Sequence, residues 1–406
     1  EIASCLVGSE MCIRDRIDIM INMDELNSDV LECQFSGIGA IVQKANTMNE
    51  ELIRLEIGDT DYTPPKMLID AIIEQYQNGK THYSSFRGED SLISSICAMY
   101  SKKSNLQINP EEILITSGGS MGLYITFKTI LSRDDEVIVL EPAWSHFGEI
   151  IKLVGGKVSR VGLNPDKDFD IDCKLIEKFI TEKTRAIVVN HPNNPTGRIY
   201  SKKELNKLIA LAKKYDLYIV CDEEYQVFEF DRKLFPIYKM YDKIITIRSF
   251  SKTYAMPGLR LGYVLASELL IHEMVKVSLY TNMYNSTLIQ AAVAQVMEND
   301  KDFPNNIRDE YKRRRDILYE ELNKIRNVRV IKSEGGMYLW VDFRKVSMDE
   351  RKIVELLRTR GKIIIVPGSC FGESGRGFAR ISLSADVKIL REAARKIQMC
   401  IEEMLT

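Results

Sequence analysis

The 406-residue chain has few of the residues that build metal sites or disulfide frameworks. It contains only four histidines, and its eight cysteines are scattered without a Cys-x-x-Cys pair. Metal sites need closely spaced ligands, and disulfide-rich folds need paired cysteines, so we expect neither. Such cysteine usage is typical of a reducing compartment, and we expect a cytoplasmic protein without a bound metal.

The chain also lacks a charge excess and a long apolar run. Its 56 basic and 58 acidic side chains leave a formal net charge of −2, which gives no overall field to attract nucleic acid or an anionic membrane. No apolar stretch approaches the roughly 18 residues that cross a bilayer. The beginning of the sequence does not follow the order of a secretory signal. We therefore expect neither a nucleic-acid partner nor a membrane association.

Residues 1–16 join poorly to the sequence that follows them. Their pattern fits neither a helix nor a strand, and CLVGSEMCIRDR resembles translated adapter sequence. We predict that this segment is either non-native or a disordered terminus. In both cases it contributes nothing to the fold.

Helical and strand patterns alternate from about residue 67 onward. This alternation predicts an α/β fold, in which helices flank a mostly parallel sheet. The predicted strands are short apolar segments at 113–116, 136–140, 186–190, 218–221, 244–247 and 262–266. Ligands of such sheets bind beyond the carboxyl ends of the strands, so the polar residues that follow the strands are candidates for chemistry.

The alternation breaks at 299–306, which we interpret as a domain boundary. A long charged helix is predicted at about 307–325, and the segments after it predict a smaller α+β domain. The elements expected there are strands at 328–331, 337–342 and 378–382, and helices at 349–360 and from 385. The predicted domains are an N-terminal arm with part of the small domain at 17–64, a large domain at 65–300 and a small C-terminal domain at 301–406.

The densest polar cluster follows the strand predicted at 244–247. The segment from Arg248 to Arg260, RSFSKTYAMPGLR, places hydroxyls, an amine and a guanidinium within thirteen residues. Lysine forms Schiff bases with carbonyl groups, whereas arginine and serine bind phosphate. The cluster predicts a site for a ligand that carries both groups, but taken alone it also fits a basic, solvent-facing turn.

Three further clusters follow other predicted strands. They are NHPNNPTG at 190–197, DEEY at 222–225 and TSGGS at 116–120. The first is a turn that fixes amide side chains, the second places a carboxylate where it can pair with a cationic ring nitrogen, and the third opens a helix whose N-terminus favours an anion. Each of them, taken alone, is also compatible with an ordinary turn or loop.

Together, NNPTG, DEEY and SFSKTYAMPGLRLGY resemble the ordered motifs of the class I/II aminotransferases, which are pyridoxal-phosphate enzymes of fold type I. The resemblance extends from about residue 55 to residue 384. It implies pyridoxal 5'-phosphate as the cofactor and transfer of an amino group between an L-amino acid and a 2-oxo acid. It also makes 65–300 the domain that binds the cofactor.

The resemblance assigns catalytic roles to three residues. Lys252 is the Schiff-base lysine and moves the proton, Asp222 faces the pyridine nitrogen, and Tyr225 bonds the phenolic oxygen. The further cofactor contacts that it implies are Gly119, Ser120, Trp144, Asn194, Ser249, Ser251, Arg260 and Tyr83. Tyr83 matches a residue that reaches the neighbouring subunit's phosphate, which implies a homodimer with shared active sites.

The resemblance also implies how the substrate is held. Arg380 matches the arginine that binds the α-carboxylate, a role suited to the planar guanidinium group. Asn194 and Gly58 are the other expected substrate contacts. Arg87 is a candidate for a second carboxylate of the substrate, but an exposed surface arginine explains it more simply.

The motifs leave the fate of the substrate open. β- or γ-elimination, amino-acid cyclisation and decarboxylation would all use Lys252 and Asp222 as well. A binding protein without turnover is a remote alternative, and the intact set of cofactor residues argues against it. The residues that would select the substrate are not evident from the motifs.

Overall fold

The structure is a computed structural model that describes residues 25–48, 50–300 and 302–406. The segment at 1–16, predicted to be non-native or disordered, lies outside the described residues. Within the described ranges, no helix combines the length and the apolarity that a membrane span requires.

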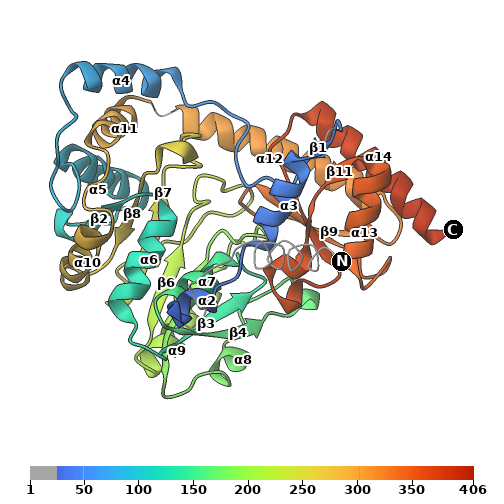
Figure 1. Cartoon of the computed structure of the whole chain (residues 1–406), viewed down its shortest axis with the longest axis horizontal. Coiled ribbons are helices and arrows are strands. Elements are labelled where there is room, and N and C mark those ends of the chain that lie inside the picture. Colours follow the sequence, from blue (N-terminus) through green and yellow to red (C-terminus); the bar gives the residue numbers. More distant parts are fainter. Residues whose placement is uncertain (1–24, 49, 301) are drawn as a thin grey trace.

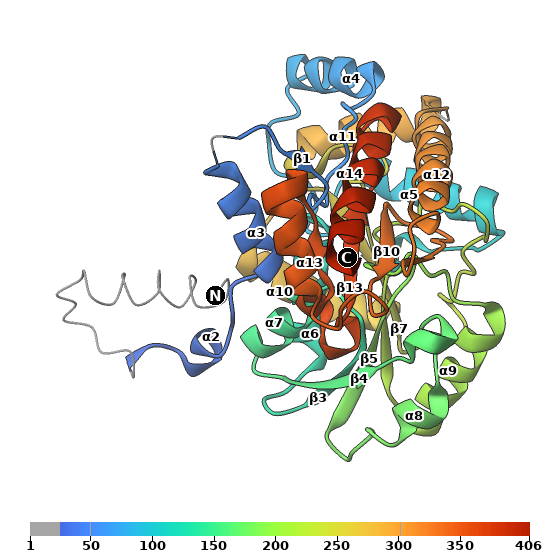
Figure 2. The same ribbon diagram turned by 90° about the vertical axis from the view of Figure 1, so that its right-hand side faces the viewer.

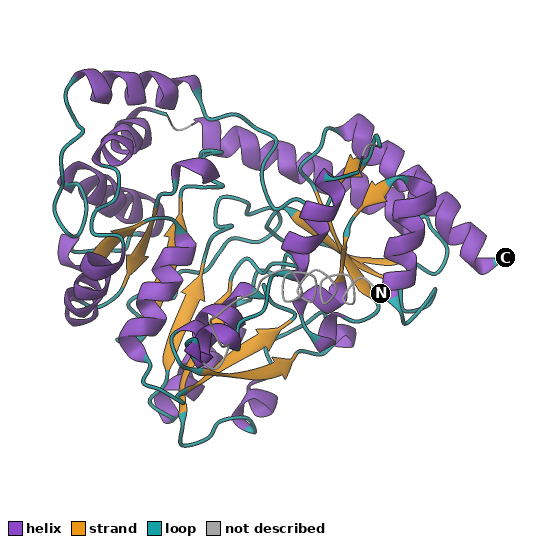
Figure 3. Cartoon of the chain, in the orientation of Figure 1, coloured by secondary structure: helices purple, strands orange, loops and turns teal. Residues whose placement is uncertain are grey.

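In the described part of the chain, seven strands form a large sheet in the order β2-β8-β7-β6-β5-β3-β4. All neighbouring strands are parallel except β8, which runs antiparallel to both β2 and β7. The strands are β2 (Ile113–Thr116), β3 (Glu136–Glu141), β4 (Lys157–Gly162), β5 (Thr184–Asn190), β6 (Tyr218–Asp222), β7 (Ile244–Ser249) and β8 (Gly262–Leu265). This mostly parallel sheet confirms the predicted α/β fold (Figure 3).

Helices cover both faces of the large sheet (Figure 1). Val137 and Val139 of β3 pack in the cluster that covers one face, whereas Ile138 packs in the cluster on the other face. Such two-sided burial explains why the strands read as continuous apolar runs. The helices are α4 (Lys66–Gln77), α5 (Asp90–Ser104), α6 (Gly119–Ile130), α7 (His146–Leu153), α8 (Cys173–Glu177), α9 (Lys202–Lys214), α10 (Glu268–Thr281) and α11 (Thr287–Asn299).

One strand of the large sheet, β4, was not predicted. It lies at the sheet edge, and only Val161 among its six residues is buried. An edge strand that is largely exposed lacks the apolar run that identified the other strands. Four of the predicted strands are one or two residues longer in the structure, and β8 ends one residue earlier than predicted.

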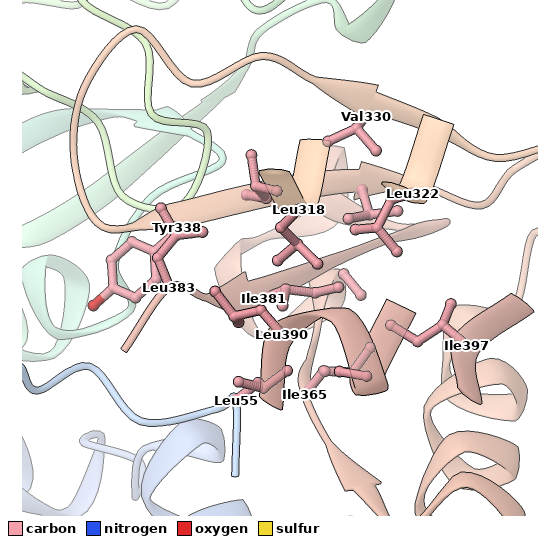
Figure 4. Packing of buried hydrophobic residues seen from close by; sticks show 14 of the residues in the cluster. Leu55, Leu318, Leu322, Val330, Tyr338, Ile365, Ile381, Leu383, Leu390 and Ile397 are labelled. Carbon is pink, nitrogen blue, oxygen red and sulfur yellow. The ribbon is translucent and has the colours of Figure 1, made fainter. Parts of the chain in front are cut away.

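A second, smaller sheet is antiparallel and has the order β12-β13-β10-β9. Its strands are β9 (Arg329–Ile331), β10 (Tyr338–Asp342), β12 (Val366–Pro367) and β13 (Phe378–Ser382). Helices α12 (Asp302–Asn323), α13 (Glu350–Leu356) and α14 (Val387–Leu405) accompany this sheet. Their apolar side chains share one core, in which Leu318, Ile381 and Leu390 lie together (Figure 4).

The N-terminal part of the described chain joins this smaller unit. Strand β1 (Ile53–Arg54) pairs in parallel with β11 (Ile363–Ile364), and Leu55 lies in the core of the small sheet. Helices α2 (Ser28–Leu31) and α3 (Gly37–Asn46) precede β1 (Figure 2). The arrangement agrees with the expected smaller α+β unit, while the domain boundaries after residues 64 and 300 remain predictions.

Two helices of the smaller unit differ from the sequence prediction. Helix α12 begins at Asp302 and not near residue 307, because Pro304 lies in its first turn, where a missing N–H group costs no helical hydrogen bond. Helix α13 ends at Leu356 and continues as a π-helical turn at Leu357–Gly361. The single helix predicted at 349–360 therefore covers two different elements.

Candidate active site

A cavity of about 230 Å³ lies where the polar ends of the large sheet face the small sheet. Lys252 and Asp222 line it from the large sheet, and Tyr338 and Arg380 line it from the small sheet. The predicted site residues that line the cavity are Gly58, Gly119, Ser120, Trp144, Asn194, Asp222, Tyr225, Ser251, Lys252, Arg260 and Arg380.

The register of the large sheet explains why motifs far apart in sequence meet. Asn190 at the end of β5 is the direct neighbour of Asp222 at the end of β6. Asp222 is in turn paired with Ile247 of β7, the strand that leads to Lys252. Because parallel strands end at the same edge of a sheet, their following loops converge on one cavity.

The amine of Lys252 points into this cavity. Its side chain is only 10% exposed, and its Nζ lies 3.7 Å from the Asp59 carboxylate oxygen. Asp59 is about half exposed, so this contact is made by a carboxylate that also meets solvent. The lysine amine thus faces the cavity, where a ligand can reach it.

Asp222 is a buried carboxylate without a cationic partner among the described residues. Its Oδ1 accepts a hydrogen bond from the Glu224 backbone N–H at 3.0 Å. Burial, and next the nearby Glu224 carboxylate, raise the pKa of the Asp222 carboxyl to about 8. A cationic group placed in the cavity would stabilise the ionised form of Asp222.

Tyr225, Asn194, Tyr338 and Arg380 form a hydrogen-bonded chain across the cavity. The Asn194 amide donates to the Tyr225 hydroxyl at 3.4 Å, and its carbonyl accepts from Arg380 Nη1 at 3.1 Å. The Tyr225 hydroxyl also lies 3.2 Å from the hydroxyl of Tyr338. Burial, and next the Tyr338 hydroxyl, raise the pKa of Tyr225, so this phenol stays protonated.

Hydrogen-bond donors gather at the other end of the cavity. Gly119 and Ser120 begin α6, whose N-terminus has no side-chain cap, so its backbone N–H groups are available to an anion. A β-carbon on Gly118 would lie 2.6 Å from Arg260 Nη2, which shows how closely Arg260 approaches this turn. Ser251 completes the set of donors that line the cavity here.

Ser249 does not line the cavity directly. Its hydroxyl donates to the Glu224 carboxylate at 3.0 Å and accepts from the Ser251 backbone N–H at 3.0 Å. It therefore contacts this end of the cavity through Glu224 and Ser251. A direct contact of Ser249 with the cofactor remains a prediction.

Arg380 is buried without a carboxylate partner in the described part of the chain. Its Nη2 donates to the Glu56 carbonyl oxygen at 2.7 Å, and its Nε has no hydrogen-bond partner. The guanidinium lies 4.1 Å from the ring centre of Tyr338. A buried guanidinium in such surroundings is suited to bind an anion that enters the cavity.

Tyr83 and Arg87 lie away from the cavity. Tyr83 is 78% exposed and stacks on Tyr284, with 4.4 Å between the ring centres. Arg87 donates to the Pro110 carbonyl and lies near Glu111, which agrees with the surface role that the sequence favoured. Within one chain, therefore, neither side chain contributes to the site.

Six described residues of the cavity lining were given no role from the sequence, namely Ile38, Leu123, Asn190, Glu224, Pro257 and Tyr338. Asn190, Glu224 and Pro257 lie inside the motifs NHPNNPTG, DEEY and RSFSKTYAMPGLR, but the sequence assigned them no role. Ile38 reaches the cavity from α3, far from any motif. Only its three-dimensional contact identifies it.

The fold and the cavity define a two-sheet α/β enzyme that combines a lysine, a buried aspartate and a buried arginine in one site. A family model described as aminotransferase class I and II matches residues 50–397. The chain belongs to this aminotransferase family, which confirms the resemblance seen in the sequence. Aminotransferase activity follows from that membership.

Relatives with assigned names are similar over most of their length. An aspartate aminotransferase of Pyrococcus horikoshii is 33% identical, with 92% of this chain and 96% of the relative covered. An aromatic-amino-acid aminotransferase of Thermococcus litoralis is 30% identical, with 87% and 92% covered. These two relatives carry different substrate names at similar identity.

Solved structures show the same similarity in three dimensions. An aspartate aminotransferase from Thermus thermophilus with maleate superposes with a TM-score of 0.88 at 30% identity, covering 92% of this chain and 99% of that one. An aromatic aminotransferase from Pyrococcus horikoshii gives a TM-score of 0.84 at 29% identity, covering 89% and 99%. The fold is therefore shared with aminotransferases of both names.

Proposed function

We propose that the chain binds pyridoxal 5'-phosphate on Lys252 and uses it to move an amino group between an L-amino acid and a 2-oxo acid. The observation that carries this proposal is that one cavity contains an accessible lysine amine, an unpaired buried carboxylate and an unpaired buried guanidinium. These three groups match the aldehyde, the ring nitrogen and the substrate carboxylate, respectively.

The described residues fit the cofactor along its whole length. Asp222 would pair with the protonated ring nitrogen, because its buried carboxylate has no other cation to stabilise it. Asn194 and Tyr225 would bond the phenolic oxygen. Bound pyridoxal phosphate supplies an electron sink for the carbon next to the amino group.

The phosphate would lie at the donor-rich end of the cavity. Ser251, Arg260 and the backbone N–H groups of Gly119 and Ser120 are the groups that would hold it. Trp144 also lines the cavity, and its ring, one face of which stacks on His146, would cover the cofactor ring. Gly58 would lie over the substrate, and a β-carbon there would come within 2.8 Å of the Tyr338 hydroxyl.

Lys252 and Arg380 would have different roles toward the substrate. Arg380 binds the α-carboxylate and so orients the Cα–H bond, while the Lys252 amine takes and returns the proton at Cα. The hydrogen bonds of Arg380 to Asn194 and to the Glu56 carbonyl fix the plane of its guanidinium. A guanidinium that is already oriented reduces the entropy cost of binding the substrate.

The assignment of Lys252 is tested by a covalent label. Borohydride reduction of the purified, cofactor-loaded chain should attach the cofactor to Lys252, and mass spectrometry of the digest should locate it there. Lys252→Ala should lose this label and at least about 10⁴-fold in amino-transfer rate, because it lacks both the attachment point and the base. A label on another lysine would contradict the proposal, and assays for 2-oxo acid against ammonia would separate transfer from elimination.

We also infer that two copies of the chain share their active sites through Tyr83. This side chain lies outside the cavity of its own chain, and the chain also exposes large apolar side chains on α4, beside Tyr83 in sequence and near Tyr284, which would suit contact with a second copy. These residues are Met67, Ile69, Ile73, Tyr76, Phe86, Tyr280 and Met283. Sedimentation of the purified chain as a monomer at micromolar concentration would contradict this inference.

A cytoplasmic location is the last part of the proposal. The described cysteines are all free thiols, namely Cys33, Cys97, Cys173, Cys221, Cys370 and Cys400. Free thiols persist in reducing compartments, which supports the expectation from the sequence. Fractionation of the source cells would test it, and recovery with secreted proteins would contradict it.

A further inference from the structure

The cavity contains a carboxylate to which the proposed function assigns no role, that of Glu224. Glu224 follows β6 two residues after Asp222 and lies half-buried in the cavity wall. Asp222 faces the proposed ring-nitrogen site, whereas Glu224 lies toward Ser249 and the start of α6. Its negative charge therefore lies at the end of the cavity that is proposed to bind the phosphate.

Both oxygens of Glu224 approach groups that suit an anion. Oε1 accepts the hydrogen bond of the Ser249 hydroxyl at 3.0 Å, and Oε2 lies 3.2 Å from the position that a β-carbon on Gly119 would take. Burial raises the pKa of Glu224, while Lys252, the Ser249 hydroxyl and Arg260 lower it, in that order. The carboxylate thus lies in the field of the same cations that would attract a phosphate.

A phosphate at this end of the cavity would meet the Glu224 carboxylate at close range. Both groups are anions that accept hydrogen bonds, and neither can donate to the other while it is fully ionised. Like charges within a few ångströms repel strongly in a partly buried site. One of the two must therefore move, take up a proton or bind less tightly.

We propose that Glu224 competes with the phosphate of the cofactor for the Ser249 hydroxyl and the N-terminus of α6. The inference rests on the proposed function, because it takes the cofactor phosphate to lie at this end. Glu224 then limits the affinity for pyridoxal phosphate, and the phosphate binds when the carboxylate turns away from Ser249 and Gly119. The same carboxylate holds the Ser249 hydroxyl by a hydrogen bond when no phosphate is bound.

The variant that tests this competition is Glu224→Gln. Glutamine keeps the shape of the side chain and can still accept from Ser249, but it removes the negative charge. The full chain, freed of cofactor by dialysis, is titrated with pyridoxal 5'-phosphate, with pyridoxal and with inorganic phosphate, and binding is followed by visible absorbance and calorimetry. We expect Glu224→Gln to bind pyridoxal phosphate and inorganic phosphate about tenfold more tightly than the natural chain, and pyridoxal with unchanged affinity.

Asp59→Asn is the matched control. It also removes one carboxylate near Lys252, but Asp59 makes no contact with Ser249 or Gly119 in the described structure. We expect it to change the affinity for inorganic phosphate less than threefold. Equal gains in both variants would show a general charge effect and overturn the inference, as would an equal gain for pyridoxal.

The experiment also separates the inference from the function on which it rests. If the natural chain binds pyridoxal phosphate and Glu224→Gln binds it no more tightly, the competition is refuted while the cofactor assignment stands. If the natural chain binds pyridoxal phosphate no better than pyridoxal, the phosphate site itself is refuted. Thermal unfolding of Glu224→Gln without ligand confirms that the variant is folded before titration.

Discussion

Arg315 and Arg380 are both buried in the smaller unit, and their surroundings differ. Arg315 of α12 lies 3.0 Å from an Asp231 oxygen and 2.7 Å from an Asp316 oxygen, and it also donates to the Ser333 carbonyl. Among the described residues, Arg380 of β13 donates hydrogen bonds to an amide oxygen and a backbone carbonyl and has no carboxylate partner. A buried charge with carboxylate partners supports the fold, whereas one without them is available to a ligand.

The comparison predicts that replacing Arg315 has the largest effect on stability. Arg315→Met should lower the free energy of unfolding by about 3 kcal/mol, because the buried Ser333 carbonyl loses its charged donor and the hydrogen bonds to Asp231 and Asp316 are lost. Urea denaturation measures the loss, and the folded fraction should keep its substrate affinity. Arg313→Met is the control, since Arg313 makes an exposed pair with Glu310 and should cost less than about 1 kcal/mol.

The same contrast holds between two carboxylates, Asp222 and Asp342. The pKa of Asp222 is raised by burial to about 8, so the folded, cofactor-free chain holds a proton that the unfolded chain releases above about pH 4. This contribution to stability is present below pH 4 and is lost as the pH rises toward 8. Asp222→Asn should therefore be more stable than the natural chain at pH 8, by several kcal/mol, and the gain should vanish at pH 4.

Denaturation of the cofactor-free chain at both pH values measures this effect. Asp342→Asn serves as the control, because Asp342 bonds the Arg344 guanidinium at 2.8 Å and its loss should destabilise the fold. A gain that is the same at pH 4 and pH 8 would show that the charge of Asp222 is not responsible. The two aspartates should thus respond with opposite signs at neutral pH.

Arg380→Met should weaken substrate binding and leave stability intact, which is the reverse of the effect expected for Arg315→Met. Loss of the guanidinium should raise the KM for the amino acid about 100-fold, which corresponds to about 2.7 kcal/mol of binding energy. The free energy of unfolding should stay the same or rise, because an unpaired buried charge is removed. Steady-state kinetics and urea denaturation on the same preparation measure both, and an unchanged KM would refute the carboxylate role.

The smallest expected effect is at the exposed ring of Tyr83. Tyr83→Phe removes one hydroxyl and should weaken the binding of pyridoxal phosphate about tenfold, with no change in thermal stability. Cofactor release during dilution measures the affinity. Tyr280→Phe, which changes a side chain that is 86% exposed, should have no effect, and equal behaviour of the two variants would remove Tyr83 from the site.

The sequence predicted those helices and strands that a local residue pattern specifies. Strands β5, β6 and β7 are buried apolar runs, and the motifs that follow them lie at the predicted sheet edge. Strand β4 was missed because its exposed residues carry no such run. The N-terminal turn of α12 was missed because a proline reads as a break even where the first turn tolerates it.

The site was predictable where a motif follows its strand and less so where distant segments meet. Lys252, Asp222 and Asn194 could be placed because strand ends converge on one edge. The bond of Arg380 to the Glu56 carbonyl joins residues 324 positions apart, and no sequence period encodes it. Glu224 stood inside a recognised motif, but only its contact with Ser249 shows the direction of its carboxylate.

The division of the cavity between two sheets has an evolutionary consequence. The residues proposed to hold the cofactor lie next to strands of the large sheet, whereas Arg380 and Tyr338 belong to the small sheet, whose helices α12 and α14 pack in a cluster with it. Mutations that reshape the small-sheet side can alter which amino acid is accepted without disturbing the lysine and its neighbours. If chemistry and specificity change separately in this way, relatives with similar sequence identity can carry different substrate names. The relatives named for aspartate and for aromatic amino acids agree with this expectation.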